Sequence, residues 1–229
     1  LRHRHTTPFE MVEFKFHCKM PIFVARQWVR HRTASLNEYS GRYSEMSSEF
    51  YMPDLSVLKQ QSDANKQGRA DNLSPEAKEL VLALLREDYE RVHGHYKRFL
   101  DPDINLAREL ARIGLSVGNY TEWYWKIDLH NLFHFLKLRL DSHAQYEIRI
   151  FAEAIARIVG DSVPLAYGAF EDYVLNSLVL SGPEVDFISR RIWPIPIDQA
   201  ITQIHEAFGN NREARECLEK LKKLVLVGE

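Results

Sequence analysis

The spacing of apolar residues along the chain separates expected strands from expected helices. Residues 11–18 place apolar side chains at every second position, and residues 120–127 do the same with aromatic side chains. This alternation is typical of strands that are buried on one face. From residue 22 the apolar positions recur at intervals of three and four residues, which predicts a short amphipathic helix.

Three further helices are expected in the middle of the chain. Ser74 is a suitable cap and Pro75 a suitable first residue for one of them, since serine accepts from free backbone amides and proline fits the first turn. Helical spacing predicts another over residues 104–117 and a long one over residues 128–160. Polar residues 59–74 predict a surface loop. These elements predict an α/β (α+β) fold, with a mixed sheet packed against long helices.

The composition changes after residue 177, where a different kind of segment is expected. Trp193-Pro194-Ile195-Pro196 predicts a stiff extended linker, and residues 211–224 have the pattern of a charged amphipathic helix. We therefore expect a core over residues 1–177 and a helical C-terminal extension over residues 178–229.

Composition and charge exclude several classes of protein. Thirty basic and 32 acidic residues give a net charge of −2, so no overall field attracts nucleic acid or anionic lipid. No apolar run approaches the ~20 residues that span a bilayer. Two cysteines cannot build a disulfide framework, and the basic opening residues lack the apolar core of a secretory signal. We expect a cytoplasmic protein with neither membrane nor nucleic acid as a partner.

The densest group of chemically active residues lies between residues 26 and 43. Its basic members are Arg26, Arg30, His31, Arg32 and Arg42. Glu38 alone cannot neutralise them, and the apolar residues between the charges argue against a fully solvated basic turn. Because guanidinium groups bind phosphate oxygens in pairs, a phosphate-bearing ligand accounts for the group. A nucleic-acid-binding module that follows a phosphate backbone and stacks bases is the rival interpretation.

Residues 30–42 carry a resemblance to a known family. They read Arg-His-Arg-Thr-Ala-Ser-Leu-Asn-Glu-Tyr-Ser-Gly-Arg and resemble the signature of the flavin-dependent thymidylate synthases, Arg-His-Arg-x-x-Ser-x-Asn-Glu-x-Ser-x-Arg, at all eight specified positions. Residues 5–10, 21–28 and 138–145 are similar to the family as well, so that the resemblance covers about residues 1–175. Family members begin further upstream, and we expect the family's N-terminal segment to be absent here.

The resemblance implies a reaction and its cofactors. A methylene group passes from methylenetetrahydrofolate to C5 of dUMP, and FAD, reduced by NADPH, supplies the hydride that completes the methyl group of dTMP. The resemblance also implies a homotetramer whose active sites take residues from several subunits. A catalytically degenerate member that binds flavin and nucleotide without turnover stays open as an alternative.

The resemblance also implies roles for individual residues. The implied FAD contacts are Thr7, Arg30, His31, Arg32, Glu38, Asp128, His130 and His134. The implied dUMP contacts are Gln27, Arg30, Glu38, Tyr39, Ser40, Gly41, Arg42, Arg112 and Arg139. Arg139 is the implied catalytic residue, because a fixed cation stabilises the charge that builds on N3 and the neighbouring carbonyl of the uracil ring. In one common form of the family, asparagines stand at the positions of Asp128 and His134.

No metal and no protein nucleophile are predicted. His130 and His134 lie four residues apart, a spacing that can bind zinc, but a zinc site needs a third ligand. The helical metalloprotease motif also requires a glutamate where Asn131 stands. Cys18 and Cys217 fall in an apolar strand face and in the terminal helix, where packing roles are expected.

Overall fold

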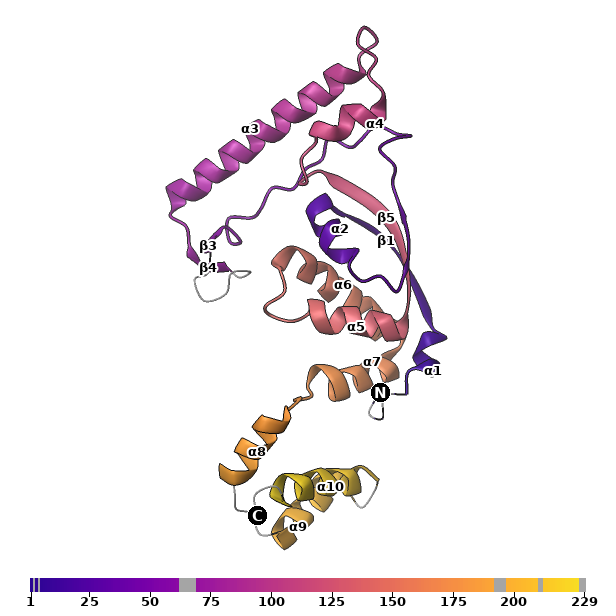
Figure 1. The fold of residues 1–229 in the computed structure, drawn as a ribbon, viewed down its shortest axis with the longest axis vertical. Helices are drawn as coiled ribbons and strands as arrows, with labels where there is room; N and C mark the ends of the chain where they lie inside the picture. Colours follow the sequence, from indigo (N-terminus) through magenta and orange to yellow (C-terminus); the bar gives the residue numbers. More distant parts are fainter. Residues whose placement is uncertain (2, 4, 62–68, 192–196, 210–211, 227–229) are drawn as a thin grey trace. The chain divides into compact units, whose positions relative to one another are not determined.

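The computed structural model describes residues 1–229 except 2, 4, 62–68, 192–196, 210–211 and 227–229 (Figure 1). Within this range the chain forms two compact units, Leu1–Leu175 and Asn176–Glu229. The linker predicted at Trp193–Pro196 lies outside the described residues.

An antiparallel sheet of three strands forms the centre of the first unit. β1 (Glu13–Pro21) and β2 (Ser35–Glu38) pair with opposite edges of β5 (Tyr120–Asp128), which gives the order β1-β5-β2. In this register Cys18 lies opposite Trp123. Burial along β5 alternates from residue to residue, as the period of a strand requires, and the strand predicted at residues 120–127 is confirmed.

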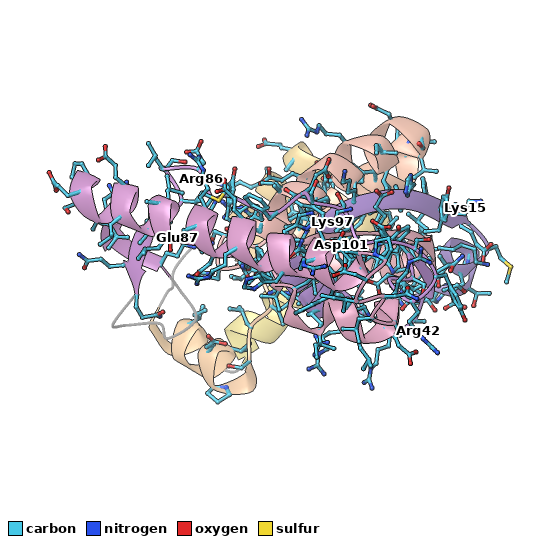
Figure 2. The ribbon with its side chains drawn as sticks, turned by 90° about the horizontal axis from the view of Figure 1, so that it is seen from above. Lys15, Arg42, Arg86, Glu87, Lys97 and Asp101 are labelled. Atoms are coloured by element: carbon cyan, nitrogen blue, oxygen red, sulfur yellow. The ribbon has the colours of Figure 1, made fainter. Side chains whose placement is uncertain are left out.

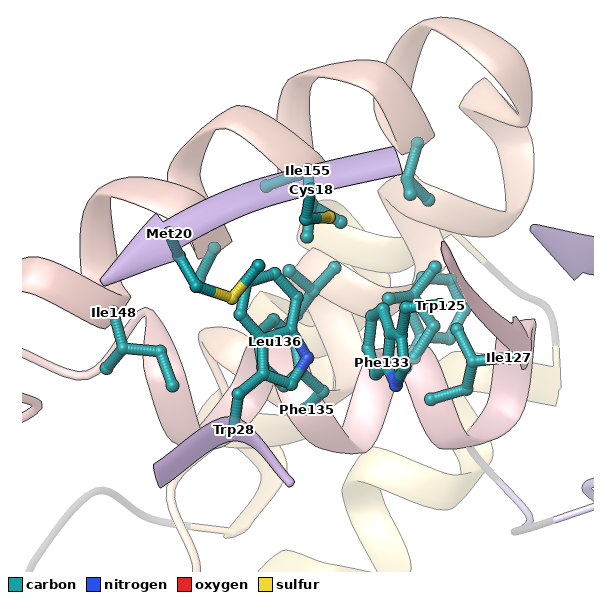
Figure 3. Close-up of a cluster of buried hydrophobic side chains, with 14 of the residues drawn as sticks. Cys18, Met20, Trp28, Trp125, Ile127, Phe133, Phe135, Leu136, Ile148 and Ile155 are labelled. Atoms are coloured by element: carbon teal, nitrogen blue, oxygen red, sulfur yellow. The ribbon is translucent and has the colours of Figure 1, made fainter. Parts of the chain in front are cut away.

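Helices α2 (Ile22–Trp28), α5 (Leu129–Arg139) and α6 (Tyr146–Ser162) lie on one side of β1 and β5 (Figure 1). Figure 3 shows the apolar cluster between them. The Trp28 ring lies 5.1 Å from that of Trp125 and 5.0 Å from that of Phe135. Large buried aromatic rings dominate the energy of a core, so this contact fixes the end of α2 against α5.

A second, smaller apolar cluster holds the segment after β2. α3 (Pro75–Leu100) begins where it was predicted, because the Ser74 hydroxyl accepts from the Ala77 amide at 3.2 Å. Near its end, the hydroxyl oxygen of buried Tyr96 accepts from the backbone amide of Met46 at 2.8 Å. The loop that follows β2 is therefore tied to α3.

Two predicted helices differ from the structure. Residues 104–117 form only α4 (Arg108–Ala111) and the 3-10 helix η1 (Arg112–Gly114). Ala111 is buried, but Ile104, Leu110, Ile113 and Val117 are exposed, so little packing supports a longer helix. The long helix expected over residues 128–160 is two helices, α5 and α6. Asp141 separates them, since its carboxylate accepts from the His143 amide at 2.8 Å in a turn that competes with the helix.

The loop predicted at residues 59–74 contains two short paired strands, β3 (Lys59–Gln61) and β4 (Arg69–Asn72). Polar composition did not reveal these strands, and an ion pair between Arg69 and Glu147 attaches β4 to the rest of the unit. This pair joins β4 to the start of α6.

The remaining described elements are short helices. In the first unit they are α1 (Thr7–Glu10), α7 (Pro164–Phe170) and the π-helix η2 (Glu171–Leu175). In the second unit they are α8 (Gly182–Arg191), α9 (Ile197–Phe208) and α10 (Arg212–Leu226). The terminal helix was predicted, whereas α8 and α9 were not. A search of the described residues finds no helix with the length and apolar character needed to cross a membrane.

Candidate active site

The first of two adjoining pockets is lined by most of the signature segment. It has a volume of about 730 Å³ and lies between α2, the end of β2, the loop after β2 and η1. Its basic residues are Arg26, Arg30, Arg32, Arg42 and Arg112. Its other predicted members are Glu38, Tyr39, Ser40 and Gly41. Seven of the nine residues expected at dUMP therefore meet in one cavity.

The first pocket carries an excess of positive charge. Within the described residues, Arg42 is the only one of its five arginines with a carboxylate partner, Glu109, at 3.1 Å. The carboxylate of Glu38 accepts instead from the Thr121 hydroxyl, at 2.7 Å. Figure 2 shows Arg42 at the outer edge of the molecule. Exposed guanidinium groups without anionic partners favour a phosphate or carboxylate ligand.

Close packing sets the shape of the wall around Gly41. A Cβ atom at this position would lie 2.6 Å from the sulfur of Met46 and 3.2 Å from Cδ of Arg112. The neighbouring Tyr39 hydroxyl donates to the Glu45 carbonyl at 2.6 Å. The missing side chain at Gly41 thus leaves room for Arg112 to reach the pocket.

The second pocket lies at the other side of the Arg-His-Arg stretch. It has a volume of about 330 Å³ and is lined by Arg30, His31, Arg32, Thr33, Ile127, Asn131, His134, Leu138 and Arg139. Arg30 and Arg32 line both pockets. The two cavities therefore adjoin through a pair of cations, with Arg139 on the side away from Arg42.

A hydrogen bond joins the signature segment to the end of α5 within the second pocket. Nε of Arg139 donates to Nε2 of His31 at 3.0 Å. Burial, followed by the charges of Arg139 and His134, lowers the pKa of His31 to about 4. Burial also lowers the pKa of Arg139. His31 is therefore neutral at physiological pH and Arg139 is charged.

The carboxylate of Asp128 forms hydrogen bonds within the chain, at the start of α5. Its Oδ1 accepts from the backbone amide of Asn131 at 2.9 Å, and its Oδ2 accepts from the side-chain amide of Asn131 at 2.7 Å. Asp128 lines neither pocket. It caps α5 and orients Asn131, whose Oδ1 remains as an acceptor on the side of the second pocket.

Three other expected ligand residues line neither pocket of the single chain. Thr7 is exposed at the start of α1, and His130 is half-buried on α5. Gln27 lies on α2, and its Oε1 is buried with no hydrogen-bond partner in the part of the chain that the structure describes. Buried polar atoms are normally paired, so this oxygen retains an unused capacity to accept a hydrogen bond.

Comparison with known proteins decides the family. A family model described as "Thymidylate synthase complementing protein" matches residues 1–165. The flavin-dependent thymidylate synthase of Rickettsia conorii is 53% identical over an alignment of 203 positions, which covers 84% of this chain and 69% of the relative. The chain belongs to the flavin-dependent thymidylate synthase family.

Further relatives extend the match over nearly the whole chain. The flavin-dependent thymidylate synthase of Rickettsia prowazekii is 50% identical over 232 residues, covering 96% of this chain and 77% of the relative. A solved structure of the UMP/dUMP methylase PolB from Streptomyces cacaoi bound with 5-Br UMP has a TM-score of 0.70 at 35% identity. It covers 75% of this chain and 79% of that one. The family and the fold class inferred from the sequence are confirmed.

Arg26 and Asn131 also line the pockets. The sequence had only grouped Arg26 with the other basic residues of its segment, and it had assigned no ligand contact to Asn131. Helical spacing was the available signal, because residues three or four apart share one face of a helix. Arg26 lies four residues before Arg30, and Asn131 lies three before His134.

The signature segment is more exposed than expected. Its arginines were expected to be partly buried, but Arg30, Arg32 and Arg42 are exposed in the single chain. Among the apolar residues between the charges, only Trp28 is fully buried.

A search of the described residues for metal sites finds no group of three or more His, Cys, Asp or Glu side chains placed to hold an ion.

Proposed function

We propose that this chain methylates dUMP to dTMP, with methylenetetrahydrofolate as carbon donor and FAD, reduced by NADPH, as hydride carrier. One observation carries the proposal beyond family membership: the signature segment separates an arginine-lined pocket from a second pocket that holds Arg139. A reaction between two phosphate-bearing molecules needs two adjoining anion sites of this kind.

The second pocket suits FAD by the chemistry of its side chains. Arg30 and Arg32 can bind diphosphate oxygens in pairs, and Asn131 and His134 can form hydrogen bonds to a flavin ring. By family resemblance the remaining contacts are Thr7, His31, Glu38, Asp128 and His130. When bound and reduced, FAD supplies the hydride that completes the methyl group.

The first pocket suits the nucleotide dUMP. Arg42 and Arg112 supply guanidinium groups for a phosphate, and the Ser40 hydroxyl adds a short donor beside them. By family resemblance Gln27, Arg30, Glu38, Tyr39 and Gly41 complete the contacts. Fixed cations around the phosphate orient the pyrimidine, which lowers the entropic part of the barrier.

Arg139 is the residue that we assign to catalysis. C5 of the pyrimidine is the nucleophile that takes up the methylene group, and the negative charge that activates it builds on N3 and a neighbouring carbonyl oxygen. A guanidinium group that is already in place stabilises that charge without reorganisation. Arg139 is half-buried and has no carboxylate partner within the described residues, so its charge is available for this task.

A homotetramer whose sites take residues from several copies is part of the proposal. Beside Arg112, the apolar side chains of Leu110, Ile113 and Val117 are 51%, 78% and 61% exposed. Tyr43, next to Arg42, is 78% exposed. Apolar surface grouped around a binding site is typical of an interface with another chain.

We also propose a cytoplasmic location. The free cysteines Cys18 and Cys217 fit the cytoplasm, which is a reducing compartment.

The test is a visible absorption spectrum of the protein with FAD, followed by titration with dUMP and assay of dTMP formation. We expect a bound-flavin spectrum that shifts as dUMP saturates, and turnover when methylenetetrahydrofolate and NADPH are added. UMP serves as the comparison ligand in the same titration, because the solved relative is a UMP/dUMP methylase.

Two outcomes would contradict the proposal. Flavin and dUMP binding without dTMP formation would identify a degenerate homologue. Oligonucleotide binding that weakens steeply with salt, in a protein that retains no flavin, would favour a nucleic-acid-binding module.

A further inference from the structure

The protonation state of His31 follows from its partner. A guanidinium group has only donors, so Nε2 of His31 must accept the 3.0 Å hydrogen bond from Nε of Arg139. An imidazole that accepts at Nε2 is neutral and carries its proton on Nδ1. The structure thus specifies both the charge and the tautomer of the ring.

His31 is held from the buried core. Its ring forms a T-shaped pair with that of Phe135, with the ring centres 4.9 Å apart and an interplanar angle of 76°. Phe135 itself is fully buried against Trp28. The backbone amide of His31 donates to the carbonyl of Trp28 at 3.0 Å. The acceptor that faces Arg139 is therefore fixed by the core, and the flexible arginine adapts to it.

Arg139 differs from a structural arginine in the choice of its partner. Arg69 is paired with the carboxylate of Glu147 at 2.6 Å, which neutralises its charge. Arg139 contacts a neutral acceptor through Nε alone. Its two Nη groups, which carry four of the five guanidinium protons, have no carboxylate partner in the described part of the chain.

We propose that His31 is a positioning residue for Arg139, because its neutral Nε2 fixes the guanidinium through Nε and leaves both Nη groups, with their full charge, for the pyrimidine. This inference rests on the proposed function, in which Arg139 stabilises charge on the uracil ring. It gives His31 a role in addition to the flavin contact that family resemblance implies.

Four variants test the coupling: His31→Ala, His31→Gln, Arg139→Ala and His31→Ala combined with Arg139→Ala. Glutamine keeps an acceptor oxygen near the position of Nε2, whereas alanine removes it. Each variant is compared at saturating FAD, so that a change in flavin affinity does not enter. The readouts are flavin occupancy, the calorimetric Kd of dUMP, and kcat and KM for dTMP formation.

We expect His31→Ala to lower kcat by about tenfold or more and His31→Gln to restore most of the loss. In the Arg139→Ala background, His31→Ala should have no further effect on kcat or on the Kd of dUMP, since a positioning residue acts only through its target. His134→Ala is the matched control. The His134 ring lies 6.2 Å from that of His31 in the same pocket. Because His134 does not act through Arg139, the fold-losses of kcat in His134→Ala and Arg139→Ala should multiply when the two changes are combined.

Two results would overturn the inference. One is a double variant whose loss of kcat equals the product of the losses in His31→Ala and Arg139→Ala, because the two residues would then act independently. The other is failure of His31→Gln to improve on His31→Ala at full flavin occupancy. Normal turnover by Arg139→Ala is a separate result, and it would remove the proposed role of Arg139 itself.

Discussion

At the scale of single residues, the chemistry depends on how each arginine is paired. Arg42 has an exposed carboxylate partner, Arg69 a buried one and Arg139 a neutral one. A buried carboxylate cancels the charge that a ligand would use, an exposed one such as Glu109 is paired only weakly and can give way to a phosphate, and a neutral acceptor only orients the guanidinium. The structure thus distinguishes arginines that hold the fold from those that remain available to an anion.

Protonation of His31 provides a residue-level prediction for stability. The unfolded chain takes up this proton near the ordinary pKa of 6.5, whereas burial, with Arg139 and His134, lowers the pKa to about 4 in the fold. Between these values the unfolded state binds more protons, so stability falls as pH falls. We expect wild type to lose stability relative to His31→Gln over this range, as measured by urea unfolding. A difference that stays constant with pH would show that His31 is not held neutral.

Gly41 provides a second residue-level prediction. A Cβ atom there would collide with Met46 and press on Arg112, so Gly41→Ala must displace one or both. We expect the Kd of dUMP to rise about tenfold by calorimetry, with little change in Tm. Gly94→Ala is the matched control, because no atom lies within 4 Å of its Cβ position. That change should stabilise α3 by about 0.5 kcal/mol and leave dUMP binding unaltered.

At the scale of elements, one polar cluster joins β4 to α6. The Glu147 side chain is 5% exposed, and its two carboxylate oxygens both accept hydrogen bonds from Nη2 of Arg69, at 2.6 and 2.7 Å. The Tyr51 hydroxyl and the Gln145 amide donate to the same carboxylate, at 3.0 and 2.9 Å. Burial raises the pKa of Glu147, but hydrogen bonds from Arg69, the backbone amide of Glu147 and Gln145, together with the charge of Arg69, lower it overall. Glu147 is therefore ionised inside the fold.

We expect Arg69→Met to cost about 3 kcal/mol of unfolding free energy at pH 7, because it leaves a buried carboxylate without its cation. The native pKa of Glu147 is depressed below 4.5, so the pair stabilises the fold above that pH and is lost as pH falls through the native value. The penalty should therefore shrink at pH 4. Urea unfolding at both pH values measures it.

The control for this cluster is an exposed pair on α3. Arg91 contacts Glu87 at 3.5 Å and also Asp88, and all three side chains are more than half exposed. Arg91→Met should change the unfolding free energy by less than about 0.5 kcal/mol. Equal effects from the two substitutions would show that burial of Glu147 is not what makes the pair important.

The sequence predicted the elements whose signal is local and missed those that depend on distant contacts. The alternation over residues 120–127 and the cap at Ser74 were sufficient for β5 and α3. The break between α5 and α6 depends on competition from Asp141, which apolar spacing does not register. The β3–β4 pair is attached through Arg69, which reaches Glu147, 78 residues away in the chain.

The candidate site shows the same division. Most residues of the contiguous signature that were predicted to bind dUMP meet at the first pocket, because one continuous segment carries them from the end of α2 through β2 into the following loop. Asn131 was missed, since its place at the second pocket depends on the side chain of Asp128. The neutral partner of Arg139 was equally unpredictable, because His31 lies 108 residues before it.

At the scale of the whole molecule, the two arginines proposed to act on dUMP lie in different pockets of one chain. Arg42 lines the first pocket and Arg139 the second, while apolar side chains around Arg112 remain exposed in one copy of the chain. If copies assemble through that surface, a complete site can combine Arg42 of one subunit with Arg139 of another. Such a site is divided between chains, which makes activity a property of the assembly.

Mixing two inactive variants tests that division. Arg42→Ala and Arg139→Ala should each be nearly inactive alone, because each lacks one cation in every site. After subunit exchange at a one-to-one ratio, random assembly of shared sites should restore about a quarter of wild-type activity, since each contributing chain is the right one half of the time. Two differently tagged wild-type preparations establish that exchange occurs. Activity that stays at background after proven exchange would place Arg42 and Arg139 of the same chain in one site, and the exposed apolar surface would then have to serve assembly without completing catalysis.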